Sequence, residues 1–175
     1  MFDGSNDYVE ISTNTVIDNA LAGQFTFEMW VMPLNAGLRY GKLFGKGTFN
    51  NQINGIVSDW NAAGPLYPIG FQYRDASNVS VGPSMGNVTF NSWYHLIITR
   101  NSSNLLSTFN NGIIASSASE SVNLGNSAFP IRLSDNSGGE RRASRIASFR
   151  FYTKGLSASE VLQNYHATKG RFGLL

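Results

Sequence analysis

The sequence predicts an all-β protein built as a two-layer antiparallel sandwich with one short C-terminal helix. Three stretches rich in aromatic and β-branched residues read as long strands: Gln24–Pro33, Trp93–Arg100 and Arg145–Tyr152. The remainder is rich in Gly, Asn and Ser, the residues of tight turns. Strands of this character must stack on another sheet to bury their apolar faces, and a sandwich is the simplest way to do so.

The stretch Gln24–Pro33 is expected to be the central strand. Side chains alternate between the two faces of a strand, so the residues divide into two sets. One face carries Phe25, Phe27, Met29 and Val31, and the other carries Thr26, Glu28, Trp30 and Met32. Both sets are apolar enough to be buried. Glu28 is the one member that would then need a polar partner.

Composition favours one domain, residues 1–175, large enough to bury roughly 70% of its unfolded surface. The formal net charge of +2 is too small to argue for nucleic acid. The chain has no cysteine, which excludes disulfides, thiolate chemistry and cysteine-ligated zinc. It has no 18-residue apolar run and no signal peptide pattern, so we expect no membrane insertion.

Positive charge is concentrated near the C-terminus. Residues 132–171 contain eight Lys and Arg residues against three Asp and Glu residues. Such a region can attract an anionic partner. The preferred interpretation is that the long stems of these side chains cover aromatic surface while their charged ends remain in water.

Shorter strands are expected between turn signals along the rest of the chain. Asn110-Asn111-Gly112 lies between two apolar runs and predicts a tight hairpin, because both turn positions tolerate positive φ. Residues 12–23 are expected to be a loop with at most one helical turn near Ile17–Leu21. The predicted shorter strands are Tyr8–Ile11, Lys42–Gly45, Ile53–Ser58, Ile69–Arg74, Leu105–Phe109, Ile113–Ser116 and Pro130–Ser134.

The C-terminal helix is predicted from its capping pattern. Ser157-Ala158-Ser159-Glu160 fits a capping box, in which the serine and the glutamate each satisfy a free backbone N–H. Val161, Leu162 and Tyr165 give the helix an apolar side, and Gly170 follows its expected end. We expect this helix to cover one edge or one end of the sandwich.

Several of these segments together resemble the concanavalin A-like lectin/glucanase superfamily, most nearly its laminin-G-like and pentraxin-like modules. The segments are FDGSNDYVEI, FTFEMWV, SWYHLIITR, FNNG and RIASFRFYTKGLSASEV, and the resemblance spans residues 2–166. It implies two curved antiparallel sheets with jelly-roll topology. The family includes glycan-binding, adhesive, virion-structural and glycoside-hydrolysing members, so the fold leaves the function open. The ending ATKGRFGL also resembles modules of tailed-phage virion proteins.

The sequence does not predict an enzyme. Glycoside hydrolysis requires two carboxylates roughly 5–10 Å apart, but Glu28 stands alone on its strand and Glu10 has no acidic neighbour two residues on. His95 lies within an apolar strand pattern and is expected to be structural. His166 lies at a helix end, where a cation suits the helix dipole. Two histidines without cysteine also argue against zinc.

Calcium is the one metal that the sequence makes possible, and no cofactor is required. Asp3, Asn6 and Asp7 place oxygen ligands in one turn, and Asp135 with Asn136 form a second such group. The preferred interpretation is that these residues form ordinary Asx-turns. In many proteins that the chain resembles, the last strand carries an acidic pair. The corresponding residues here are Ala147 and Ser148, which weakens the expectation of a calcium site.

A ligand site is predicted where aromatic and polar residues gather between the early strands. Aromatic rings stack on sugar faces, and charged side chains bind sugar hydroxyls. The alternative is that Trp60 and Tyr67 fold back onto the sandwich. The predicted ligand-binding residues are Trp60, Tyr67, Tyr73, Arg74 and Asp75.

Taken together, these features favour a non-enzymatic binding or adhesion module that recognises surface carbohydrate. We expect it to act outside the cell or on a virion surface, beside other subunits of a multimeric assembly. The alternative is a structural virion or surface component that makes protein–protein contacts and binds no glycan. An exposed aromatic loop would favour the first interpretation, and a large apolar patch the second.

Overall fold

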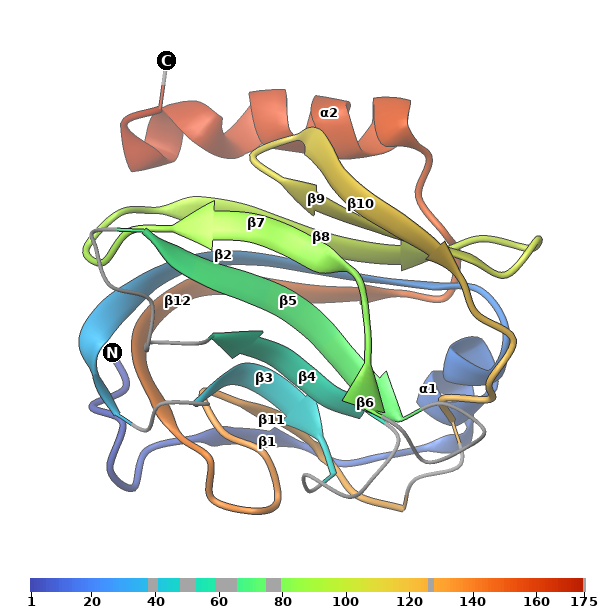
Figure 1. Cartoon of the computed structure of the whole chain (residues 1–175), viewed down its shortest axis with the longest axis horizontal. Helices are drawn as coiled ribbons and strands as arrows, with labels where there is room; N and C mark the ends of the chain where they lie inside the picture. The colour runs from blue at the N-terminus through green and yellow to red at the C-terminus, as the bar shows by residue number, and fades with distance from the viewer. Residues whose placement is uncertain (38–40, 48–52, 59–65, 75–79, 126–127, 175) are drawn as a thin grey trace.

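The computed structural model describes residues 1–37, 41–47, 53–58, 66–74, 80–125 and 128–174. Two antiparallel sheets pack face to face, and a C-terminal helix lies against one of them (Figure 1). The sandwich and its C-terminal helix confirm the predicted fold class. One sheet has the order β1-β11-β3-β4-β5-β6, with β7 also pairing with β5, and the other has the order β10-β9-β8-β2-β12.

The strands agree with most of the predicted ranges. They are β1 (Val9–Ile11), β2 (Phe25–Gly37), β3 (Lys42–Lys46), β4 (Ile53–Ser58), β5 (Tyr67–Arg74), β6 (Ser80–Val81), β7 (Ser84–Val88), β8 (Tyr94–Arg100), β9 (Leu105–Asn110), β10 (Ile113–Ser119), β11 (Ile131–Leu133) and β12 (Arg142–Tyr152). The helices are α1 (Thr15–Ala22), α2 (Ala158–Thr168) and the 3₁₀ helix η1 (Lys169–Phe172).

Strand β2 is buried on both faces, as its sequence predicts. It pairs with β8 on one side and with β12 on the other. Phe25 and Phe27 point between the sheets, where the Phe27 ring centroid lies 4.8 Å from that of Phe44 and 5.1 Å from that of Phe151. Trp30, on the opposite face, is 1% exposed. Contacts on both faces make β2 the centre of the core.

The segment before β2 forms a longer helix than predicted. Residues Thr15–Ala22 form two turns, where at most one was expected near Ile17–Leu21. Asn14 caps the helix, its Oδ1 accepting hydrogen bonds from the N–H groups of Val16 and Ile17 at 3.0 Å. Ile17, Ala20 and Leu21 are buried at the spacing of one helical face. The cap and the apolar face explain why this polar-looking segment is helical.

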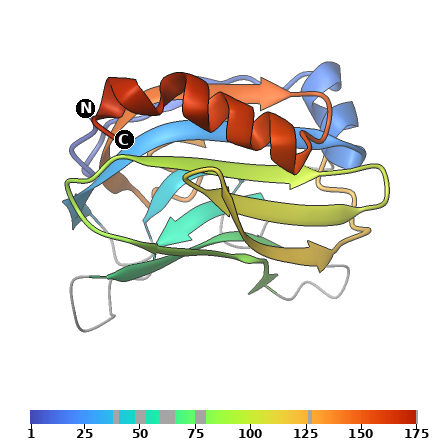
Figure 2. The same cartoon turned by 90° about the horizontal axis from the view of Figure 1, so that it is seen from above.

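The C-terminal helix covers a face of the sandwich, so the predicted position at an edge or end is wrong. Helix α2 lies across the outer face of the five-stranded sheet (Figure 2). Its Val161 packs with Ile97 and Phe109 of that sheet. The predicted capping box is present, with the Glu160 N–H donating to Ser157 Oγ at 3.3 Å and the Ser157 N–H donating to Glu160 Oε2 at 2.8 Å.

The hairpin between β9 and β10 confirms the predicted turn. Asn111 and Gly112 have φ values of 52° and 80°, both in the left-handed region that a type I′ turn requires. This turn lies below α2, where a Cβ added to Gly112 would come within 2.9 Å of the Tyr165 ring. The absence of a side chain at Gly112 therefore lets the hairpin pack closely against Tyr165 of the helix.

Candidate functional site

The predicted ligand-binding residues are only partly described by the structure. Trp60 and Asp75 lie outside the described residues. Tyr67 is half-buried, with its ring centroid 4.1 Å from that of Phe90. Tyr73 is 3% exposed and belongs to the core, so its ring offers no free face to a ligand, contrary to expectation. The reason is strand alternation, which turns Tyr67 and Tyr73 inward on β5. The ligand-binding role of the set stays a prediction.

Arg74 is half-buried at the end of β5. Because neighbouring residues of a strand point to opposite faces, it lies on the outer face while Tyr73 points inward. The structure therefore does not bring the Arg74 guanidinium and the Tyr73 ring to one surface. Of the predicted aromatic residues that the structure describes, Tyr67 alone is partly accessible.

In the turn at the N-terminus, the carboxylate oxygens of Asp3 and Asp7 accept hydrogen bonds from backbone N–H groups of the same turn. The Ser5 N–H donates to Asp3 Oδ1 at 2.7 Å, and the Asp3 N–H donates to Asp7 Oδ2 at 3.2 Å. The first is an Asx-turn contact, the preferred interpretation for this turn, and the second closes the turn through the Asp7 carboxylate. In the part of the chain that the structure describes, no group of three or more acidic, His or Cys residues could hold a metal ion. Weak calcium binding at this turn stays a prediction.

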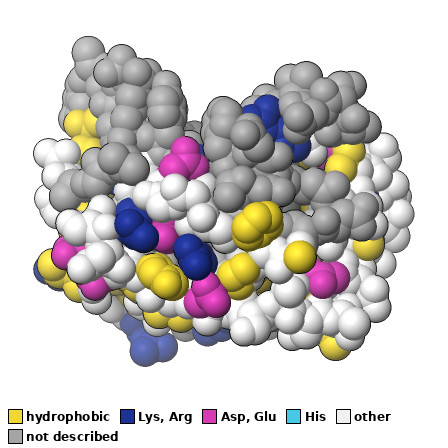
Figure 3. Space-filling model, turned by 90° about the horizontal axis from the view of Figure 1, so that it is seen from below, with side chains coloured by type: hydrophobic (Ala, Val, Ile, Leu, Met, Phe, Trp, Pro, Cys, Tyr) yellow, Lys and Arg dark blue, Asp and Glu magenta, His cyan; other side chains and the backbone are white. Residues whose placement is uncertain are grey.

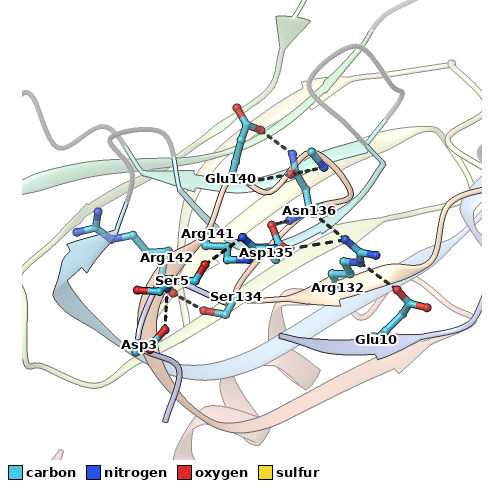
Figure 4. A network of polar contacts seen from close by, with 11 residues as sticks. Asp3, Ser5, Glu10, Arg132, Ser134, Asp135, Asn136, Glu140, Arg141 and Arg142 are labelled. Carbon is cyan, nitrogen blue, oxygen red and sulfur yellow. Dashed lines mark hydrogen bonds and ion pairs between the residues drawn. The ribbon is translucent and has the colours of Figure 1, made fainter. Parts of the chain in front are cut away.

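The second acidic turn is bound by cationic side chains. Asp135 is fully buried, and its Oδ2 lies 3.2 Å from Arg141 Nε and 3.8 Å from an Arg132 nitrogen (Figure 4). Burial raises the pKa of Asp135, although the Asn136 N–H and both arginines act to lower it. Asn136 donates to Glu140 Oε2 at 2.5 Å. Two arginines against one carboxylate disfavour calcium, so this network serves to hold the loop between β11 and β12.

Both oxygens of the Glu28 carboxylate are bound by neighbouring side chains beneath α2. Oε1 lies 2.6 Å from an Arg150 nitrogen and 3.1 Å from His95 Nε2. Oε2 accepts hydrogen bonds from Tyr152 at 2.7 Å and Asn164 at 3.0 Å. Burial acts to raise the pKa of Glu28, but these partners outweigh it and lower the pKa to about 2. A fully paired carboxylate with so low a pKa is unsuited to act as a general acid. His95 is fully buried against this carboxylate, which agrees with the structural role predicted for it.

A pocket of about 130 Å³ lies beside this cluster, where the end of α2 and η1 cross β12. We call it the C-terminal pocket. Trp30 forms part of its wall, with the indole centroid 4.8 Å from His95 and 4.0 Å from Phe172. The indole N–H donates to Thr168 Oγ1 at 2.9 Å. The lining residues are Trp30, Ala147, Ser148, Arg150, Thr168, Arg171 and Phe172.

The polar groups of the C-terminal pocket are mostly hydrogen-bond donors. Arg150 keeps 42% of its side chain exposed while it pairs with Glu28. Arg171 is exposed and has no hydrogen bond or ion pair with the described residues. The Ser148 hydroxyl is buried and also lacks a partner there. Thr168 is already engaged, because its hydroxyl donates to the Asn164 carbonyl at 2.7 Å. No acidic side chain lines the pocket.

The sequence pattern does not predict this pocket. Trp30 falls on a face of the strand that is predicted to be buried, and Arg171 and Phe172 follow the predicted helix end. Nothing in the linear pattern shows that the chain folds back over β12 there. The one available signal was the excess of basic residues in 132–171, and Arg150 and Arg171 belong to it.

A profile described as the concanavalin A-like lectin/glucanases superfamily matches residues 3–162. The chain belongs to this superfamily. The match confirms the resemblance to laminin-G-like modules and identifies the sandwich as the jelly roll of this family. No curated protein matches the sequence.

Solved structures of toxin binding domains share the fold. The binding domain of Paraclostridial Mosquitocidal Protein 1 is 17% identical with a TM-score of 0.72, over 95% of this chain and 42% of that chain. A structure of botulinum neurotoxin type C is 12% identical with a TM-score of 0.69, over 93% of this chain and 41% of that chain. The cell entry of that toxin is described as dependent upon interaction with two ganglioside molecules. The botulinum neurotoxin DC binding domain in complex with rat synaptotagmin II is 14% identical with a TM-score of 0.66, over 93% and 41%.

The chain therefore spans less than half the length of the binding domains that it matches. At these identities the likeness concerns the fold.

Among the described residues, no helix is both long enough and apolar enough to cross a bilayer.

Proposed function

We propose that the chain is a non-catalytic module that binds acidic carbohydrate at a surface outside the cell or on a virion. The observation that carries this proposal is the C-terminal pocket, in which Arg150, Arg171 and the Ser148 hydroxyl lie beside the Phe172 ring. Membership of a lectin-containing superfamily supports it. So do relatives in fold that are described as binding domains, one of them dependent on gangliosides.

The chemistry of the pocket favours an anionic group on the sugar. A neutral sugar needs acceptors as well as donors, whereas a carboxylate or sulfate accepts hydrogen bonds only. The pocket offers two guanidiniums and no acidic side chain. Its volume of about 130 Å³ is below the usual range for drug-sized ligands, so it suits one charged group with part of a sugar ring.

Catalysis is absent from this proposal because no acidic side chain lines the C-terminal pocket. Glu28 is held by four partners. Glu160 lies at the other end of α2, where it is bound to Lys154 and to the helix N-cap. Neither carboxylate faces a second one across the C-terminal pocket, as glycoside hydrolysis would require.

Binding at one such site is expected to be weak, because each hydrogen bond between the sugar and the protein replaces a hydrogen bond that both groups made to water. Useful affinity would come from several copies on one assembly, each adding effective concentration for the next. This requirement agrees with the expectation that the module works beside other subunits.

The test is a glycan array probed with a multimeric form of the chain, comparing wild type with Arg171→Gln. Arg171 is exposed and unpaired among the described residues, so its replacement should not disturb folding. Loss of one charged contact should weaken binding to acidic glycans about five- to tenfold. The matched control is Lys154→Gln, which removes an equal charge at the opposite end of α2 and should leave binding unchanged.

A third variant, Trp60→Ala, tests the site predicted from sequence. Loss of binding in Trp60→Ala with retention in Arg171→Gln would move the site to the segment around Trp60. An array on which the wild type binds no glycan would overturn the proposal. The chain would then be a structural component that makes protein–protein contacts.

A further inference from the structure

Strand β12 ends the five-stranded sheet and has a free edge. One side of β12 pairs with β2 along its whole length. On the other side, Phe2 pairs with Ser144 through two backbone hydrogen bonds of 2.8 and 3.1 Å. Beyond that point, residues 145–152 pair with no further strand in the described parts of the chain. Unpaired N–H and C=O groups along an edge are a template for another strand.

The facing sheet extends past this edge. Strand β1 ends the seven-stranded sheet on the same side, and its Val9 is 46% exposed. Val9 and Ile11 point toward the interior, because Glu10 points outward and binds Arg132 at 3.0 Å. The inner face of β1 is therefore not covered by the opposite sheet. Figure 3 views the molecule from below, on the side of the seven-stranded sheet, where hydrophobic side chains lie among charged ones.

The uncovered space is an apolar groove of about 290 Å³ along β12. We call it the edge groove. Its residues come from the N-terminus, from β1 and β11, and from the inner face of β12. They include Phe2, Val9, Ile11, Leu133, Ile146 and Phe149. The groove lies where the inner side chains of one more strand would be placed.

The outer face of β12 has the opposite character. Arg145 lies opposite Met32 and Arg150 lies opposite Glu28, so both arginines point to the outer face. Arg145 is exposed and has no ion-pair partner among the described residues. Glu28 is buried and already held by four partners. The outer side of this edge therefore presents positive charge, and the inner side presents apolar surface.

We propose that the free edge of β12 binds one extended segment of a protein partner, in which apolar and acidic residues alternate. Side chains of a strand alternate between two faces, so one set enters the edge groove while the other lies beside Arg145 and Arg150. The backbone of the segment supplies the hydrogen bonds, as in other cases of strand addition. A second copy of the chain fits poorly, because pairing β12 with itself brings arginines together.

The test uses labelled octapeptides and fluorescence anisotropy with the wild-type chain. Acetyl-(Glu-Val)₄ should bind about tenfold more tightly than acetyl-(Lys-Val)₄, because acidic side chains attract the two arginines and basic ones are repelled. A block peptide with four Glu followed by four Val has the same composition without alternation and should not bind. Equal binding of all three peptides would overturn the proposal.

N-methylation tests the backbone pairing. The N–H groups of successive residues in a strand point to opposite edges, so methylation of the four Val residues blocks one edge and methylation of the four Glu residues blocks the other. One of these two peptides should lose binding and the other should keep it. Equal affinity of the two would exclude strand addition.

Two variants of the chain and two control variants complete the test. Arg145→Glu should shift the preference toward acetyl-(Lys-Val)₄, and Val9→Glu should weaken both peptides by placing charge in the edge groove. The matched control is Val16→Glu on α1, where the side chain is 62% exposed and lies outside the groove. Arg171→Gln separates this site from the C-terminal pocket and should leave peptide binding unchanged. Reversible dimers in sedimentation that the peptide dissociates would assign the edge to a second copy and overturn the proposal.

Discussion

His95 and Glu28 form a fully buried pair beneath the C-terminal helix, with His95 Nε2 3.1 Å from Glu28 Oε1. The pair joins β8 to β2, and Asn164 of α2 donates to the same carboxylate at 3.0 Å. Arg150 and Tyr152 of β12 bind it as well, so a single carboxylate connects three strands and the helix that covers them. This relationship leads to the first two predictions.

Glu28→Ala should lower the free energy of unfolding by about 3–5 kcal/mol, since it leaves buried donors without their acceptor. The measurement is urea denaturation followed by tryptophan fluorescence. Glu10→Ala is the control, because Glu10 pairs with Arg132 at an exposed site and should cost less than about 1 kcal/mol. Similar losses in the two variants would show that the Glu28 cluster is not a centre of stability.

Acid should destabilise the protein through the same carboxylate. The pKa of Glu28 is about 2 in the fold against an ordinary value of 4.5. A lowered pKa means that its stabilisation is complete above pH 4.5 and is lost as the pH falls toward 2. Thermal melts between pH 5 and pH 2 should show this loss. Glu28→Gln should have a shallower dependence in that interval, and an unchanged slope would contradict the assignment.

Truncation of Phe27 or of Trp30, two buried aromatic residues of β2, should strongly lower the free energy of unfolding. Phe27→Ala and Trp30→Ala should each cost about 3–5 kcal/mol, the usual range for a buried large aromatic residue. Phe27 is 1% exposed between the sheets, and Trp30 is 1% exposed beneath α2 and η1. Denaturant melts provide the measurement, with the exposed Val16→Ala as control. A loss below about 1 kcal/mol would show that β2 is peripheral.

Gly112→Ala should cost about 1–2 kcal/mol for the left-handed conformation alone. The added methyl would also meet the Tyr165 ring at 2.9 Å, so α2 should loosen as well. Gly170→Ala is the matched control, because a Cβ there meets nothing within 4 Å and its φ is not positive. Hydrogen exchange of α2 distinguishes the two variants. Equal protection of the helix in both would contradict a supporting role for the hairpin.

Calcium binding, if titration calorimetry detects it, should be weak and should disappear in Asp7→Ala. Asp3 and Asp7 are engaged in their own turn, and a calcium ion would have to displace those contacts. Dissociation constants near those of weak extracellular modules, about 10⁻⁴–10⁻³ M, are expected at best. Tight binding that survives Asp7→Ala would place a calcium site elsewhere in the chain.

Much of the fold could be predicted because its signals are local. Alternation identified both faces of β2, Asn111-Gly112 marked the hairpin, and the capping box at Ser157 marked the start of α2. The sequence also predicted that Glu28, on a buried face of this strand, would need a polar partner. Helix α1 was underestimated because its buried residues lie in a polar stretch, where packing against the core outweighs weak local propensity.

The candidate sites were much less predictable. Tyr73 looked like a ligand platform in the sequence, yet the register of β5 turns its ring into the core. Arg150 and Phe172 are 22 residues apart, and the return of η1 over β12 brings them to one pocket. Contacts of this kind depend on how elements cross, which residue periodicity does not encode.

The sequence by itself determined the class of the fold, the central strand and the turns, because periodicity and backbone conformation are set by neighbouring residues. The tertiary structure alone decided which partners satisfy Glu28, where α2 lies, and where the free edge of β12 runs. Those features depend on contacts between segments far apart in the chain. The two surfaces proposed for binding, the C-terminal pocket and the edge groove, both arise from such contacts.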